Sequence, residues 1–247
     1  MKLPEILERE PLVDALFEVR LLETSPIADI LPGVLFQEDG PTTKITRLPV
    51  GELPKDVRSN DPNLQYAPVV RVELEKYIVS MGDRSVLINC KLPYPKWNQF
   101  KAEILSIMAR VAKLGVAGSV ERYSLKYVNL IQAPTITEQV SKIKMSITLG
   151  DVTVSSDHAN VQVHHKEDGI IHILSVVVGA QGNLADGQAI FGTVVDVDSI
   201  REFAPIDFTS FESNLERGLQ DLRIANKKKF FACLTPETIE EMGPVYV

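Results

Sequence analysis

Residues 69–92 read VVRVELEKYIVSMGDRSVLINCKL, with two β-rich runs on either side of the turn signal MGD. Alternate positions give each run one apolar face, made of Val70, Val72, Leu74, Val86, Ile88 and Cys90. Two such runs joined by a short turn that contains glycine are typical of a β-hairpin. Because the strands of a hairpin are antiparallel, this stretch predicts a largely antiparallel sheet.

Further strand patterns lie on both sides of this hairpin. PLVDALFEVRLL (11–22) and SVERYSLKYVNLIQ (119–132) alternate between apolar and polar positions, as strands with one buried face do. EDG at 167–169 predicts a second hairpin, and a turn is expected at GNLADG (182–187), before the strand AIFGTVVDVD. The stretch 23–68 is rich in proline and is predicted to be mostly irregular, with a short strand near KITRLPV.

Two long segments show helical periodicity. Residues 97–116 and 208–231 each repeat apolar side chains every three or four positions. Many strands with only two long helices predict an α+β protein in which the helices pack on a largely antiparallel sheet. The two helices divide the chain into an N-terminal half, 1–118, and a C-terminal half, 119–247. These halves form either two similar sheet-and-helix lobes or one continuous domain.

The composition is that of an ordinary globular protein, with 24% charged and 45% hydrophobic residues. The 26 basic and 33 acidic residues give a net charge of -7, which argues against a protein that neutralises phosphates over a broad face. The N-terminus MKLPEILEREPLV lacks the pattern of a signal peptide, and no later run is as apolar as a membrane span. We therefore expect a cytoplasmic protein without membrane attachment.

The strand at 119–132 carries the first candidate binding residues. Alternation places its tyrosines on one face, where they are expected in the core, and places Arg122 and Lys126 on the other. Together with Glu18 and Arg20 of the strand at 11–22, these residues are the candidate surface for an anion or a partner. If the two strands are neighbours, an ion pair between Glu18 and Arg122 or Lys126 is the favoured interpretation.

A metal site is the alternative. His164 is one of four histidines on or beside the second hairpin, and Asp196 and Asp198 lie two apart on a predicted strand, so their carboxylates share one face. Imidazole and carboxylate groups bind divalent metals, so these three residues would serve a hydrolase or a nuclease-like enzyme. Solvent-facing strands are the favoured interpretation, because His164 and His165 point to opposite faces and no third acidic partner is evident.

The sequence has no dinucleotide-binding, P-loop, serine-hydrolase or zinc-protease motif. This favours a non-enzymatic binding or interaction protein without a cofactor, whose partner is a protein or a small ligand. Enzymatic activity is left open, and so is a homodimer. A third alternative is weak nucleic-acid binding through Arg122, Lys126 and the lysines at 227–229.

Three stretches taken together resemble a known family. PLVDALFEVRL (11–21), ERYSLKYVNLI (121–131) and KKFFACLTPETIEEMGP (228–244) are similar to the signatures of a sporadically distributed, functionally uncharacterised prokaryotic family of about this length. That family more usually has glycine and arginine where this chain has Ser124 and Lys126. The resemblance implies a bacterial or archaeal cytoplasmic protein, and the patchy distribution suggests an accessory protein of a mobile or defence gene cluster.

Overall fold

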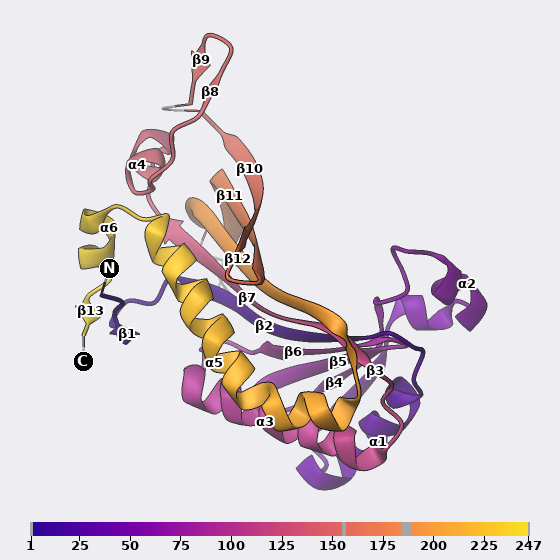
Figure 1. Cartoon of the computed structure of the whole chain (residues 1–247). Coiled ribbons are helices and arrows are strands. Elements are labelled where there is room, and N and C mark those ends of the chain that lie inside the picture. The colour runs from indigo at the N-terminus through magenta and orange to yellow at the C-terminus, as the bar shows by residue number, and fades with distance from the viewer. Residues whose placement is uncertain (1, 155–156, 184–188, 247) are drawn as a thin grey trace. The chain divides into compact units, whose positions relative to one another are not determined.

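The computed structural model describes residues 2–154, 157–183 and 189–246. It confirms the α+β fold, with a nine-stranded antiparallel sheet and helices packed on it (Figure 1). The chain forms two compact units, the first made of Met1–Val13, Lys126–Ser199 and Arg223–Val247 and the second of Asp14–Leu125 and Ile200–Leu222. The division into the consecutive halves 1–118 and 119–247 stays a prediction.

The strands of the large sheet lie in the order β10-β11-β12-β7-β2-β6-β5-β4-β3. Their bounds are β2 Leu12–Leu21, β3 Lys44–Arg47, β4 Pro68–Glu73, β5 Tyr77–Gly82, β6 Ser85–Cys90, β7 Val120–Gln132, β10 Ala159–Glu167, β11 Ile170–Asn183 and β12 Ala189–Ile206. Two small pairs join β1 Ile6–Leu7 to β13 Pro244–Val245 and β8 Thr148–Leu149 to β9 Val152–Thr153. The turn expected at GNLADG lies largely outside the described residues.

The helices confirm both long segments predicted from the sequence and add shorter ones. They are α1 Ile27–Asp39, α2 Lys55–Asn60, α3 Trp97–Leu114, α4 Ile136–Ser141, α5 Phe208–Ala232 and α6 Pro236–Glu241, with the 3-10 turn η1 Pro49–Glu52. In the described part of the chain, no helix has the length and apolar character that crossing a lipid bilayer requires.

The stretch 69–92 forms three strands rather than the predicted two. The turn at MGD is confirmed between β5 and β6, but the first run also turns back, so that β4 and β5 pair with each other as well. Val72, Val79 and Ile88 face one another across the three strands and are fully buried. The extra turn falls at the charged residues Glu75 and Lys76, which no buried strand could accommodate unpaired.

The prediction that 23–68 is mostly irregular is wrong for residues 27–39, which form α1. Ile27, Leu31 and Leu35 recur at every fourth position and are fully buried. Pro32 lies inside this helix and deprives it of one backbone hydrogen bond, which the burial of the apolar stripe outweighs. The short strand expected near KITRLPV is confirmed as β3.

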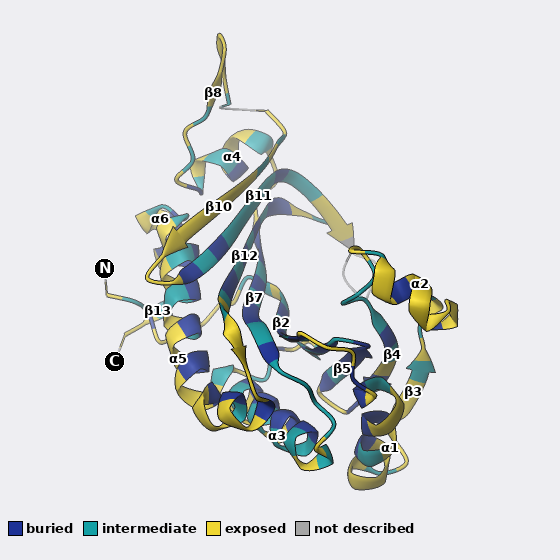
Figure 2. Ribbon diagram, turned by 45° about the vertical axis from the view of Figure 1, so that its right-hand side comes forward, coloured by how far each residue is buried: buried dark blue, intermediate teal, exposed yellow. Residues whose placement is uncertain are grey.

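In the second unit, α3 and the beginning of α5 run side by side against one face of the sheet (Figure 1). Lys101 forms an ion pair with Glu216 at 2.8 Å, and the indole nitrogen of Trp97 donates to Gln220 at 3.2 Å. Among the exposed residues of both helices, buried ones recur along the ribbon (Figure 2). They are Phe100, Ile104, Ile107, Met108 and Val111 of α3 and Phe208, Phe211, Leu215, Leu219 and Leu222 of α5.

The first unit has an apolar core of its own, at the C-terminal part of α5 and at α6. Val195 and Val197 of β12 pack there with Phe231, Leu234 and Ile239. Helix α6 begins at Pro236, and the side chain of Thr235 just before it accepts a hydrogen bond from the backbone N–H of Thr238. This cap satisfies one of the free N–H groups at a helix start.

Candidate functional site

Glu18 of β2 forms the predicted ion pair with Arg122 of the neighbouring strand β7. Its carboxylate accepts a hydrogen bond from Arg20 Nε at 3.0 Å and lies 3.5 Å from Arg122 Nη2. Only 8% of Glu18 is exposed, so both arginines balance a carboxylate that has lost most of its water. The expected pair of Glu18 and Arg122 is therefore present, and its use as a recognition surface stays a prediction.

Lys126 pairs with a carboxylate other than Glu18, which the sequence suggested as a partner. Its ammonium group forms an ion pair with Asp196 of β12 at 2.8 Å, and both side chains are partly buried. A candidate anion-binding lysine thus neutralises a candidate metal ligand. Because the two strands are neighbours in the sheet, this contact is an internal one within the first unit.

The three candidate metal ligands are not brought together. His164 is exposed on β10, 3.4 Å from the side chain of Gln162, whereas Asp196 and Asp198 lie on β12. Since β11 runs between these strands, their backbones are about 10 Å apart. No group of three potential ligand residues that could hold a metal ion occurs among the described residues. The metal-dependent alternative stays a prediction without a supporting cluster.

His172, directly opposite His165 on the β10–β11 hairpin, differs from the other histidines. It is 1% exposed, and its Nδ1 lies 2.9 Å from the hydroxyl of Ser199, which in turn accepts a hydrogen bond from Asn226 at 3.0 Å. Burial, and secondly the nearby Lys229, lower the pKa of His172 to about 4. The ring is therefore neutral at neutral pH and belongs to a buried polar chain.

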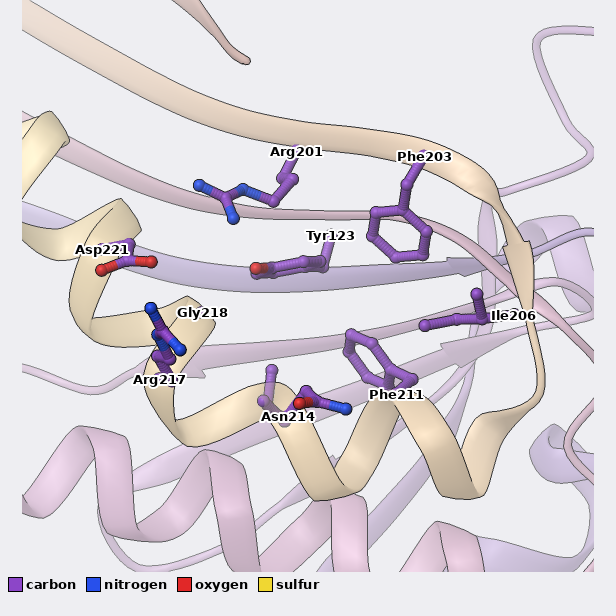
Figure 3. Close-up of a pocket in the computed structure, with 10 residues that line it drawn as sticks. Tyr123, Arg201, Phe203, Ile206, Phe211, Asn214, Arg217, Gly218 and Asp221 are labelled. Carbon is purple, nitrogen blue, oxygen red and sulfur yellow. The ribbon is translucent and has the colours of Figure 1, made fainter. Parts of the chain in front are cut away.

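The second unit contains a cavity of about 310 Å³ where β7, the end of β12 and the first turns of α5 meet (Figure 3). We call it the Tyr123 cavity. The residues that line it are Tyr123, Arg201, Phe203, Ile206, Phe211, Asn214, Leu215, Arg217, Gly218 and Asp221. Its apolar residues lie at one end and its charged residues at the other (Figure 3).

Aromatic rings form one wall of the cavity. The ring centroid of Tyr123 lies 5.9 Å from that of Phe203 and 5.4 Å from that of Phe211, both in tilted or edge-to-face contact. Phe208 continues the row at 5.7 Å from Phe211. Such contacts between rings add stability beyond the area they bury. The rings thereby hold the wall in one arrangement.

Gly218 makes room for the end of the Tyr123 side chain. A Cβ atom at this position would lie 2.2 Å from the tyrosine hydroxyl oxygen. Gly218 is in the interior of α5, where glycine is about 1 kcal/mol less favourable than alanine. The close approach of Tyr123 to the helix explains why a glycine stands there.

Gly218→Ala should destabilise the protein by about 1–3 kcal/mol, because overpacking outweighs the gain in helix propensity. Gly33→Ala is the matched control: a Cβ atom at this exposed position of α1 would meet no other atom within 4 Å, so the variant should gain up to about 1 kcal/mol. Urea unfolding of both variants measures the difference. Tyr123→Phe added to Gly218→Ala should restore part of the lost stability, because it removes the hydroxyl that the new Cβ atom would meet. If both alanine variants gain stability equally, the close contact with Tyr123 does not explain the glycine.

The charged end of the cavity contains Arg201, Arg217 and Asp221 (Figure 3). Arg201 is half-buried, and its Nε has no hydrogen-bond partner among the described residues. A buried donor without a partner is unfavourable by about 1–3 kcal/mol. The pKa of Tyr123 is raised, mainly because the hydroxyl is buried; Arg201 opposes this rise and Asp221 adds to it. At neutral pH the hydroxyl is therefore a neutral donor.

The sequence pattern did not identify this site. Tyr123 was predicted to be a core residue and is one, at 5% exposure, but its role in a cavity depends on β12 and α5. Gly218 was the available signal, because an isolated glycine in a helical pattern often marks a close contact. Arg201 had no such signal, since an arginine next to an apolar run is common at strand surfaces.

No protein-family model matches the chain, and no curated protein matches it either.

Proposed function

We propose that the chain is a non-enzymatic binding protein that holds a small organic ligand in the Tyr123 cavity. The observation that carries the proposal is the lining, with an aromatic wall at one end and charged groups at the other. Ligand sites combine an apolar lining with a few polar groups that fix orientation, and their volumes begin at about 300 Å³. The cavity volume of about 310 Å³ falls at that lower limit.

The protonation state of Tyr123 also supports binding. A tyrosine hydroxyl is protonated at neutral pH in any case, and burial raises the pKa of Tyr123 further, so this hydroxyl can donate a hydrogen bond to a ligand. A general base would need a pKa near the working pH. Membership of the sporadically distributed prokaryotic family, with an accessory role in a mobile or defence gene cluster, remains a prediction beside this proposal.

The test is a binding screen with single-ring compounds of three kinds: anionic, neutral and cationic. We expect at least one kind to shift the amide NMR signals of residues that line the cavity, with dissociation constants of about 1 mM or below, as is usual for fragments. Asn214→Trp should abolish these shifts, because this exposed α5 residue lines the cavity and an indole there would obstruct it.

Ser213→Trp is the matched control, since Ser213 is the exposed neighbour of Asn214 and does not line the cavity. It should leave the shifts unchanged. If no compound shifts the cavity residues, or if both tryptophan variants bind as the original chain does, the proposal is refuted.

A further inference from the structure

The charged end of the Tyr123 cavity has a surplus of positive charge. Arg201 and Arg217 line it together with a single carboxylate, that of Asp221, so two positive groups stand against one negative group. Arg217 and Asp221 are exposed, whereas Arg201 is half-buried. Water and salt screen the exposed pair far more than the half-buried guanidinium. The field inside the cavity is therefore dominated by Arg201.

Arg201 also has hydrogen-bonding capacity that the described residues leave unused. Its Nε is buried and has no partner among them. Arg58, by contrast, directs Nε and Nη2 to the two oxygens of one carboxylate. A guanidinium presents its N–H groups in a fork that fits the two oxygens of a carboxylate. A carboxylate is therefore an anion whose geometry suits the guanidinium of Arg201.

The opposite end of the cavity determines what the rest of the ligand must be. Phe203, Ile206 and Phe211 form this end, and Figure 3 shows them away from the guanidinium of Arg201. Tyr123 lies between the two ends, with its hydroxyl on the side of Arg201 and Asp221. A molecule that fills the cavity therefore needs an anionic head and an apolar body.

We propose that the ligand is a small organic acid with one carboxylate, which Arg201 binds, and an aromatic or branched apolar body, which packs against Phe203 and Phe211. This inference rests on the proposed function and specifies its ligand class. Tyr123 donates a hydrogen bond to the same carboxylate. Asp221 stays outside the contact, on the exposed rim.

The experiment compares 3-phenylpropanoate with 3-phenylpropanamide, which has nearly the same size and no charge. Titration of the full chain, followed by NMR at pH 7.5, measures both dissociation constants and the Nε–H signal of Arg201. We expect the acid to bind at least about tenfold more tightly than the amide, because hydrogen bonds between charged groups are the stronger ones. The acid should also shift the Arg201 signal.

Arg201→Gln should weaken binding of the acid by about 10- to 100-fold and leave binding of the amide unchanged. Arg71→Gln is the control, because it changes the net charge of the protein by the same amount as Arg201→Gln. Arg71 is exposed, belongs to the same unit and does not line the cavity. Asp221→Asn should not weaken binding of the acid. Weaker binding in Asp221→Asn, or tighter binding of phenylalanine than of 3-phenylpropanoate, would overturn the assignment in favour of a zwitterion.

The outcomes separate this inference from the proposed function. If acid and amide bind the cavity equally well, the ligand class is wrong and the proposed binding function stands. If neither compound shifts the cavity residues, the carboxylate assignment is refuted, and the broader screen with anionic, neutral and cationic compounds then decides whether the cavity binds any small ligand. The comparison of acid and amide uses the unaltered chain, so it holds even if a variant is unstable.

Discussion

Arg58→Met should lower the free energy of unfolding by about 3–5 kcal/mol, as is found when one partner of a buried ion pair is removed. Arg58 and Asp83 are each 8% exposed. Nε of Arg58 donates to Asp83 Oδ2 at 2.7 Å, and Nη2 donates to Oδ1 at 2.9 Å. The methionine variant leaves the Asp83 carboxylate buried without its cation, and this uncompensated charge is the source of the loss.

The position of the pair explains why its effect should also be local. Arg58 is the one buried residue of α2, and its Nη1 donates to the carbonyl of Leu53. Asp83 lies in the turn between β5 and β6. Because this pair ties the segment around α2 to the turn, limited proteolysis of Arg58→Met should cut within residues 53–65 faster than in the original chain.

Arg47→Met is the matched control, because Arg47 and Glu52 form an ion pair at 3.4 Å in which both side chains are about 70% exposed. Exposed pairs contribute about 0–1 kcal/mol. The double variant Arg58→Met with Asp83→Leu should recover part of the loss, since it removes the unpaired charge as well. If Arg58→Met is no more destabilising than Arg47→Met in urea unfolding, the pair has no such role.

The sequence was sufficient to predict the sheet and the two long helices, because their periods follow directly from backbone geometry. Side chains alternate along a pleated strand and recur every 3.6 residues along a helix, so β2, β7, α3 and α5 were visible as patterns. The same rule failed for α1, where Pro32 and its neighbours are read as signals of a loop. The burial of Leu31 and Leu35 stabilises this helix. Burial depends on how the whole chain packs, so the local sequence pattern does not show it.

The candidate site was harder to predict, because it depends on contacts between distant parts of the chain. The ion pair of Glu18 and Arg122 could be predicted, since it requires only that two patterned strands are neighbours. The Tyr123 cavity requires in addition that Arg201 and Gly218, from β12 and α5, meet Tyr123. The alternation of side chains along a strand shows on which face of the sheet a residue lies. It does not show which residues of another strand or helix contact that residue.

Acidification should destabilise the chain through His172. Its pKa is about 4 in the folded protein, against 6.5 for an ordinary histidine, mainly because the ring is buried and secondly because of Lys229, with Glu167 acting in the opposite direction. Between these two values the unfolded chain binds a proton that the folded chain does not. Stability therefore falls as the pH drops from about 6.5 to about 4, by about 3 kcal/mol in total.

The measurement is urea unfolding of the original chain and of His172→Gln at several pH values between 7 and 4. Glutamine does not titrate, so the variant should lack this contribution, and the difference in stability between the two proteins should shrink by up to about 3 kcal/mol as the pH falls. Carboxylates such as Glu167, which forms an ion pair with Lys229 at 2.6 Å, titrate in both proteins, and their effect largely cancels in the difference.

Ser199→Ala separates the burial of His172 from its hydrogen bond. This variant removes the hydroxyl that lies 2.9 Å from Nδ1 but keeps the ring in place. We expect it to be about 1 kcal/mol less stable than the original chain at neutral pH, and to remain sensitive to acid, because burial is the main cause of the lowered pKa. If His172→Gln loses stability toward pH 4 as steeply as the original chain, then His172 is not the group responsible, and the acid sensitivity must come from the carboxylates.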